Sequence, residues 1–87
     1  FFKWVDAVEV KKISDSERIF LAKIPRKALK GKEGVNIEYR FNKNGDAIYS
    51  SQYNVILDKK KGLNEVELSY YAGTDGVDVP EYNIYGK

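Results

Sequence analysis

The chain of 87 residues contains no cysteine, no histidine and no methionine. Disulfide bonds and thiolate chemistry are therefore excluded. Because histidine is the side chain most often used for proton transfer near neutral pH, its absence excludes a Ser-His-Asp triad and a histidine-ligated metal centre within this chain. Paired carboxylates remain, but Glu65 and Glu67 have the spacing of an ordinary solvated strand face. We therefore expect no enzyme activity, no cofactor and no metal site.

Long apolar runs and a strong charge imbalance are also missing. No stretch approaches the roughly eighteen apolar residues of a membrane-spanning helix, so no span is predicted. The net charge of +2, from 15 basic and 13 acidic residues, is too balanced to indicate a nucleic-acid partner. The chain opens on strand-like sequence, Phe1-Phe2-Lys3-Trp4, without an initiator methionine. We expect residues 1–87 to be a single domain excised from a larger extracellular or cell-surface protein, with neighbouring domains as partners.

What the chain has instead is period-two alternation. Apolar side chains occupy every second position from Val35 to Phe41, and an Asn44-Gly45 pair follows closely. Such alternation predicts a strand with one buried and one solvated face. Asn-Gly tolerates the positive φ angles of a tight hairpin turn, so the pattern predicts a hairpin at this point.

The same pattern recurs along the chain. We expect the first strand to be partly buried on both faces or bulged near Asp6. Trp4 is either a core anchor, which we favour, or part of an aromatic site. The second is nearly all apolar and should be central, whereas the polar middle of the fourth suits a sheet edge. Pro80 should lie at a strand edge or in a bulge. The expected strands cover residues 2–13, 18–24, 35–42, 47–58, 65–71 and 77–85.

Six or seven short strands at regular spacing predict an all-β fold, a small antiparallel β-sandwich of immunoglobulin- or fibronectin type III-like character. The alternative is a small barrel of the oligonucleotide-binding type. Such a barrel needs a helix between its middle strands, and only the segment Arg26–Lys32 has the sequence for a helical turn.

Basic residues concentrate in two connections of the chain. If consecutive strands run up and down, the segments 26–34 and 58–64 meet at one end of the domain, with Lys3 and Lys87 near the termini. We expect acidic residues at the other end: Asp15, Glu17, Asp46, Asp75 and Asp78. The basic pole, as we call it, is a candidate site for a polysaccharide or another anionic surface. It comprises Arg26, Lys27, Lys30, Lys32, Lys59, Lys60 and Lys61.

Aromatic residues suggest a second kind of site, because exposed rings on a sheet face can stack on sugars or bases. The candidates are Tyr49, Tyr53, Tyr71, Tyr82 and Tyr85. The sequence thus leaves three functions open. The first is a non-catalytic extracellular module for adhesion, spacing or protein interaction. The others are a carbohydrate-binding module and, less favoured, a nucleic-acid-binding barrel.

Overall fold

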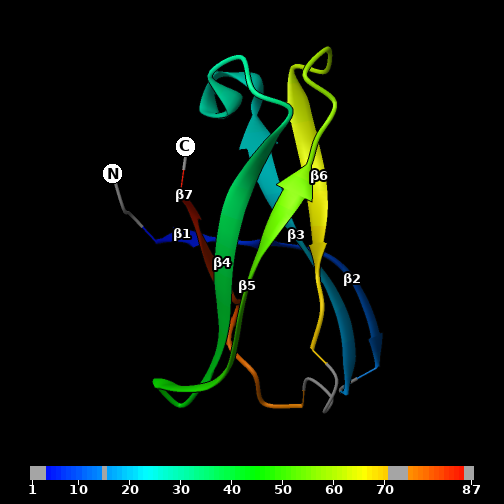
Figure 1. The fold of residues 1–87 in the computed structure, drawn as a ribbon. Helices are drawn as coiled ribbons and strands as arrows, with labels where there is room; N and C mark the ends of the chain where they lie inside the picture. The colour runs from blue at the N-terminus through cyan, green and yellow to red at the C-terminus, as the bar shows by residue number, and fades with distance from the viewer. Residues whose placement is uncertain (1–3, 15, 71–74, 86–87) are drawn as a thin grey trace.

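The computed structural model describes residues 4–14, 16–70 and 75–85, which form two antiparallel sheets packed face to face (Figure 1). In the first sheet the order is β1 (Val5–Asp6), β7 (Glu81–Tyr85), β4 (Gly34–Lys43) and β5 (Asp46–Ile56). In the second it is β2 (Val8–Ser14), β3 (Glu17–Pro25) and β6 (Leu63–Leu68). The predicted all-β sandwich is confirmed. The barrel alternative is wrong, because the strands divide into two separate sheets.

The core lies between the sheets and follows the predicted alternation. Val35, Ile37, Tyr39 and Phe41 of β4 are all buried, whereas the residues between them are only partly covered. From the other sheet, β3 contributes Phe20, Ala22 and Ile24, and β6 contributes Val66 and Leu68. The rings of Phe20 and Phe41 meet edge to face across the two sheets, with centroids 6.0 Å apart. As predicted, β3 is the central strand of its sheet.

The hairpin between β4 and β5 also forms where the sequence places it. Lys43 pairs with Asp46, and the two residues between them have positive φ angles, 53° at Asn44 and 85° at Gly45. These angles are those of the type I′ turn that suits the twist of a β-ribbon. The strand that follows, β5, ends the four-stranded sheet, as its polar middle predicted.

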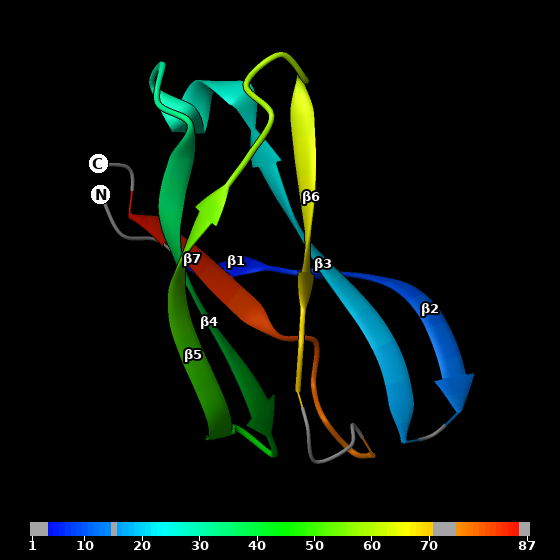
Figure 2. The same ribbon diagram turned by 45° about the vertical axis from the view of Figure 1, so that its right-hand side comes forward.

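The expected first strand is corrected in two respects. It breaks at Ala7, which is buried and donates its N–H to the Pro80 carbonyl at 2.8 Å. The chain therefore changes sheets there, from β1 to β2 (Figure 2). The second part, β2, is exposed along its whole length instead of being buried on both faces. Instead of a bulge near Asp6, the strand ends at Asp6 and the chain continues in the second sheet from Val8.

Trp4 is also corrected: it is not a core anchor. Its ring is half-buried, and the Arg40 guanidinium lies 3.9 Å from the ring centroid. Arg40 projects to the outer face of the four-stranded sheet, where it donates to the Glu81 carboxylate at 3.0 Å. Cation–π contact with Arg40 therefore holds Trp4 on the outside of the sandwich.

The last strand is shorter than predicted, because it begins at Glu81 and not at residue 77. Pro80, which is buried, precedes it and has no N–H to donate to a ladder. Within the sheet β7 is not an edge strand, since it pairs with β1 on one side and β4 on the other.

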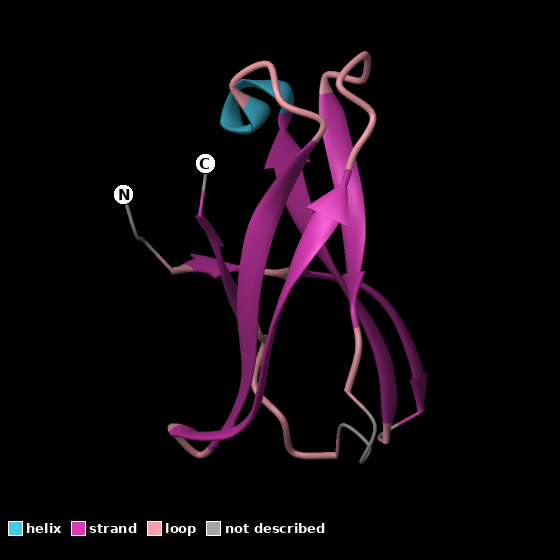
Figure 3. Ribbon diagram, viewed as in Figure 1, coloured by secondary structure: helices cyan, strands magenta, loops and turns pink. Residues whose placement is uncertain are grey.

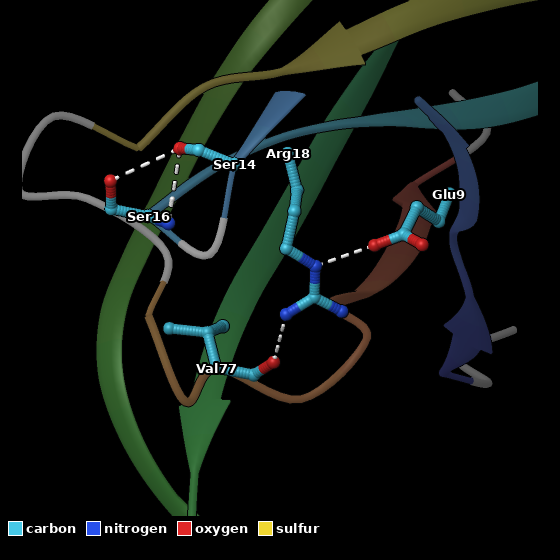
Figure 4. Close-up of polar contacts among 5 residues, drawn as sticks. All are labelled: Glu9, Ser14, Ser16, Arg18 and Val77. Atoms are coloured by element: carbon cyan, nitrogen blue, oxygen red, sulfur yellow. Dashed lines mark hydrogen bonds and ion pairs between the residues drawn. The ribbon is translucent and has the colours of Figure 1, made fainter. Parts of the chain in front are cut away.

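An ion pair between Arg18 and Glu9 links β3 to the edge strand β2 (Figure 4). Arg18 of β3 contacts the Glu9 carboxylate of β2 and donates to the Val77 carbonyl at 2.6 Å. Its guanidinium also lies 5.0 Å from the centre of the Phe20 ring. This one side chain therefore joins the edge strand to the loop before β7, and it covers the ring beneath it.

Candidate functional site

The basic pole is built from two loops that lie at the same end of the sandwich. The first leaves β3 through the 3₁₀ turn η1 (Arg26–Leu29), and the second connects β5 to β6 (Figure 3). The Arg26 N–H donates to the Gly62 carbonyl at 3.1 Å, and the Leu57 N–H donates to the Glu33 carbonyl at 2.8 Å. The predicted meeting of the two segments is confirmed. It holds although each connection crosses between sheets, because consecutive strands still alternate in direction.

The first loop is anchored by an apolar side chain. Leu29, the last residue of η1, is 1% exposed and belongs to the core. The Lys32 N–H then donates back to the Leu29 carbonyl at 3.0 Å, and Lys30 and Gly31 between them adopt positive φ angles of 53° and 79°. Burial of Leu29 therefore fixes the turn, and its lysines are left on the surface.

The second loop is closed by a buried amide. Asn64 is 7% exposed; its Oδ1 accepts the Asp58 N–H at 3.2 Å and its Nδ2 donates to the Asp58 carbonyl at 3.0 Å. The Asp58 carboxylate in turn accepts the Lys60 N–H at 2.9 Å. This pair of residues holds Lys59, Lys60 and Lys61 in a defined turn. Sequence reasoning missed it, although Asn64 has the parity of the buried Val66 and Leu68 and was therefore an inward polar residue.

All seven cationic side chains of the basic pole are exposed. The segments 26–33 and 58–62 contain those seven basic residues and two acidic ones, Glu33 and Asp58, which leaves a surplus of five positive charges. The whole chain has a net charge of +2, so the remainder carries a net charge of −3. The net positive charge of these two loops is therefore larger than that of the whole chain.

The opposite end has the acidic residues that the sequence places there. Glu17, Asp46, Asp75 and Asp78 are exposed near the turns at that end. Lys43 lies among them, next to Gly76. Asp15, Lys3 and Lys87, also expected at the ends of the domain, lie outside the described residues.

The three tyrosine candidates whose side chains the structure describes do not form one exposed surface. Tyr82 is only 5% exposed and donates its hydroxyl to the Lys23 carbonyl at 2.9 Å, so its candidacy is corrected: its ring is part of the core. Tyr49 and Tyr53 share one face of β5, as predicted, but this face points inward. Tyr49 packs against Tyr39 and Phe41, whereas Tyr53 remains 39% exposed. Tyr71 and the side chain of Tyr85 lie outside the described part of the chain.

Within the described ranges, no group of three or more acidic side chains is arranged to hold a metal ion. None of the helical structure there has the length and apolar character that a membrane crossing requires. Comparisons of the chain with family models, with curated proteins and with solved structures found no match.

Proposed function

We propose that this chain is a non-catalytic β-sandwich module of a secreted or cell-surface protein, and that its basic pole attaches it to an anionic polysaccharide. The observation that supports this most is the joining of two lysine-rich loops by backbone hydrogen bonds at one end of the sandwich. Cations on a preformed surface lose less conformational freedom on binding than cations on separate mobile segments. A repeating polyanion can engage several of them at once.

The immunoglobulin- or fibronectin type III-like character of the domain is part of this proposal. Seven strands divided into sheets of four and three are consistent with that architecture. Such a fold is used by many unrelated binding modules, so the function has to be argued from the surface. On that surface the charge at the basic pole is the strongest feature.

An anionic ligand is favoured over neutral-sugar stacking by the positions of the aromatic rings. Of the tyrosine candidates whose side chains are described, Tyr82 is in the core and Tyr49 packs against it. Tyr53 alone keeps more than a third of its surface exposed. One partly exposed tyrosine and an indole already stacked by the Arg40 guanidinium are a poor platform for a sugar chain. Charge attraction at the basic pole is therefore the better supported mode of binding.

Binding to immobilised dextran sulfate tests this proposal, with neutral dextran as the control matrix. We expect retention on the sulfated polymer that weakens steeply as salt rises, because exposed charges are screened over about 10 Å at 0.1 M salt. Lys59→Gln with Lys61→Gln should lower the affinity about tenfold, from the loss of two exposed ion pairs. Lys11→Gln with Lys43→Gln removes the same charge far from the basic pole and should leave the affinity nearly unchanged.

Two results would reject the proposal. One is no retention on dextran sulfate at low salt. The other is an equal loss for the two double variants, which would show that only net charge matters. Tighter binding to an oligonucleotide of matched charge than to dextran sulfate would reject the polysaccharide as the ligand and favour nucleic acid.

A further inference from the structure

Each sheet ends in two edge strands, and three of the four edges in the described structure have features that discourage pairing with another chain. β1 has only two residues, Val5–Asp6. β2 is interrupted by two register shifts and includes Glu9, Lys11 and Lys12. β6 is short and directs the charged Glu65 and Glu67 outward. Short length, irregular register and charge are the usual means by which proteins keep sheet edges from associating.

β5 differs from all three. It is the longest strand of the molecule, with 11 residues. From Ala47 to Ile56 it contains no charged residue, no proline and no glycine, and half of these residues are isoleucine, valine or tyrosine, which favour strands. Its one irregularity is a register shift opposite Phe41 and Asn42, so the stretch from Tyr49 to Ile56 pairs regularly with β4. Among the described strands β4 is its only neighbour, and none of them lies along its other backbone edge.

The sequence of β5 is complementary to itself about Ser51. If two copies pair antiparallel with Ser51 on a two-fold axis, Ser50 of each copy lies opposite Gln52 of the other. Tyr49 of each lies opposite Tyr53 of the other. Because residues of equal parity meet, inward side chains face inward ones and outward side chains face outward ones. We propose that β5 pairs in this way with β5 of a second copy, joining two four-stranded sheets into one.

Aromatic contacts support this register over its neighbours. Within one chain the Tyr39 ring lies 6.2 Å from those of Tyr49 and Tyr53. Pairing about Ser51 extends this row across the axis through two Tyr49–Tyr53 contacts and covers the exposed part of Tyr53. A two-fold axis at Gln52 or Tyr53 would give no such contact or only one. Aromatic cross-strand pairs are among the contacts that stabilise antiparallel sheets.

Charge also favours this partner. The paired stretch from Tyr49 to Tyr53 contains no charged residue, and Asp46 lies before the register shift, at opposite ends of the joined ribbon in the two copies. The interface thus brings no like charges together. The two-fold symmetry closes the assembly at two chains. This inference rests on β5 alone and is independent of the basic pole.

Sedimentation equilibrium over a concentration range tests the dimer. We expect the wild-type chain to reach the mass of two chains. Ser50→Lys with Gln52→Lys alters two exposed outward positions and places lysines opposite each other twice across the axis. This variant should weaken association by about tenfold or more, because directly opposed like charges destabilise a strand pair. Val8→Lys with Val10→Lys adds the same charge to β2, also at exposed positions, and should dimerise as the wild type does.

A charge-swap mixture shows that the lysine variant is folded and that β5 is the interface. The Ser50→Glu, Gln52→Glu variant alone should also be monomeric, and equal amounts of the lysine and glutamate variants should form a mixed dimer. A wild-type chain that stays monomeric at about 1 mM, or a lysine variant that dimerises as tightly as the wild type, would overturn the proposal. So would open-ended assembly.

The register can be tested separately because the chain has no cysteine of its own. Ser51→Cys lies on the proposed axis and should form a disulfide-linked dimer under mild oxidation. Asn54→Cys should not, since the two copies of residue 54 are about 20 Å apart along the strand. Equal cross-linking of both variants would reject this register.

Discussion

At the scale of the residue, Tyr39 illustrates how a polar atom is accommodated in this core. Its ring is 4% exposed, and its hydroxyl donates to the Ser69 carbonyl at 2.9 Å. Burial raises the pKa of the Tyr39 hydroxyl to about 12, and the neighbouring Tyr49 adds to the effect. Burial also raises the pKa of the Tyr82 hydroxyl. The fold therefore holds these hydroxyls in their neutral form.

This has a consequence for stability in alkali. The folded-state pKa of Tyr39 lies above the usual value of about 10. The stability that its neutral hydroxyl contributes is therefore complete below pH 10 and is lost as the pH rises toward 12. Tyr39→Phe should cost about 1 kcal/mol at neutral pH through the lost hydrogen bond. Between pH 10 and 12 the variant should also lose less unfolding free energy than the wild type does, by up to about 2 to 3 kcal/mol. Urea unfolding over this range measures both effects, and parallel pH curves for wild type and variant would contradict the assignment.

At the scale of the element, the sequence predicts strand faces well and strand positions in the sheets less well. The alternation of β4 and the Asn44-Gly45 turn place the inward face and the hairpin correctly, because both depend on local geometry. The exposure of β2 and the outward position of Trp4 depend on which strands end a sheet. The polarity of β3 and β5 placed those two strands correctly, but the mixed pattern of the first strand did not show that it divides between two sheet edges.

The candidate site shows the same division. The meeting of the two basic loops follows from strands that alternate in direction, which can be predicted by counting strands. The clamp formed by Asn64 and Asp58, and the anchor Leu29, depend on tertiary contacts. Asn64 alone had a visible signal, since a polar residue at an inward position needs a partner.

The close approach of β4 and β5 at Gly34 gives a test at this scale. A Cβ at Gly34 would overlap the backbone carbonyl oxygen of Val55, and backbone atoms cannot move aside cheaply. Gly34→Ala should therefore destabilise the fold by about 1 to 3 kcal/mol. Gly62→Ala is the matched control, because its Cβ would meet only the flexible Arg26 side chain at 3.6 Å. Thermal unfolding measures the difference, and equal melting temperatures for the two variants would refute the argument.

At the scale of the whole molecule, charge and topology together define a direction. β5 runs from the acidic end toward the basic pole (Figure 1). Antiparallel pairing of two β5 strands would therefore turn the two basic poles away from each other. A dimer of this kind has an anion-binding surface at each extremity. Such a dimer can link two polymer molecules, whereas a protein monomer can bind only to one.

Light scattering from dextran sulfate solutions distinguishes these two behaviours. The wild-type chain, at concentrations where it dimerises, should cross-link the polymer and increase scattering several-fold. The Ser50→Lys, Gln52→Lys variant should bind the polymer without cross-linking it. Because this variant carries more positive charge than the wild type, a loss of cross-linking cannot result from weaker attraction to the polyanion. Equal scattering with both proteins would show that polymer bridging does not require pairing through β5.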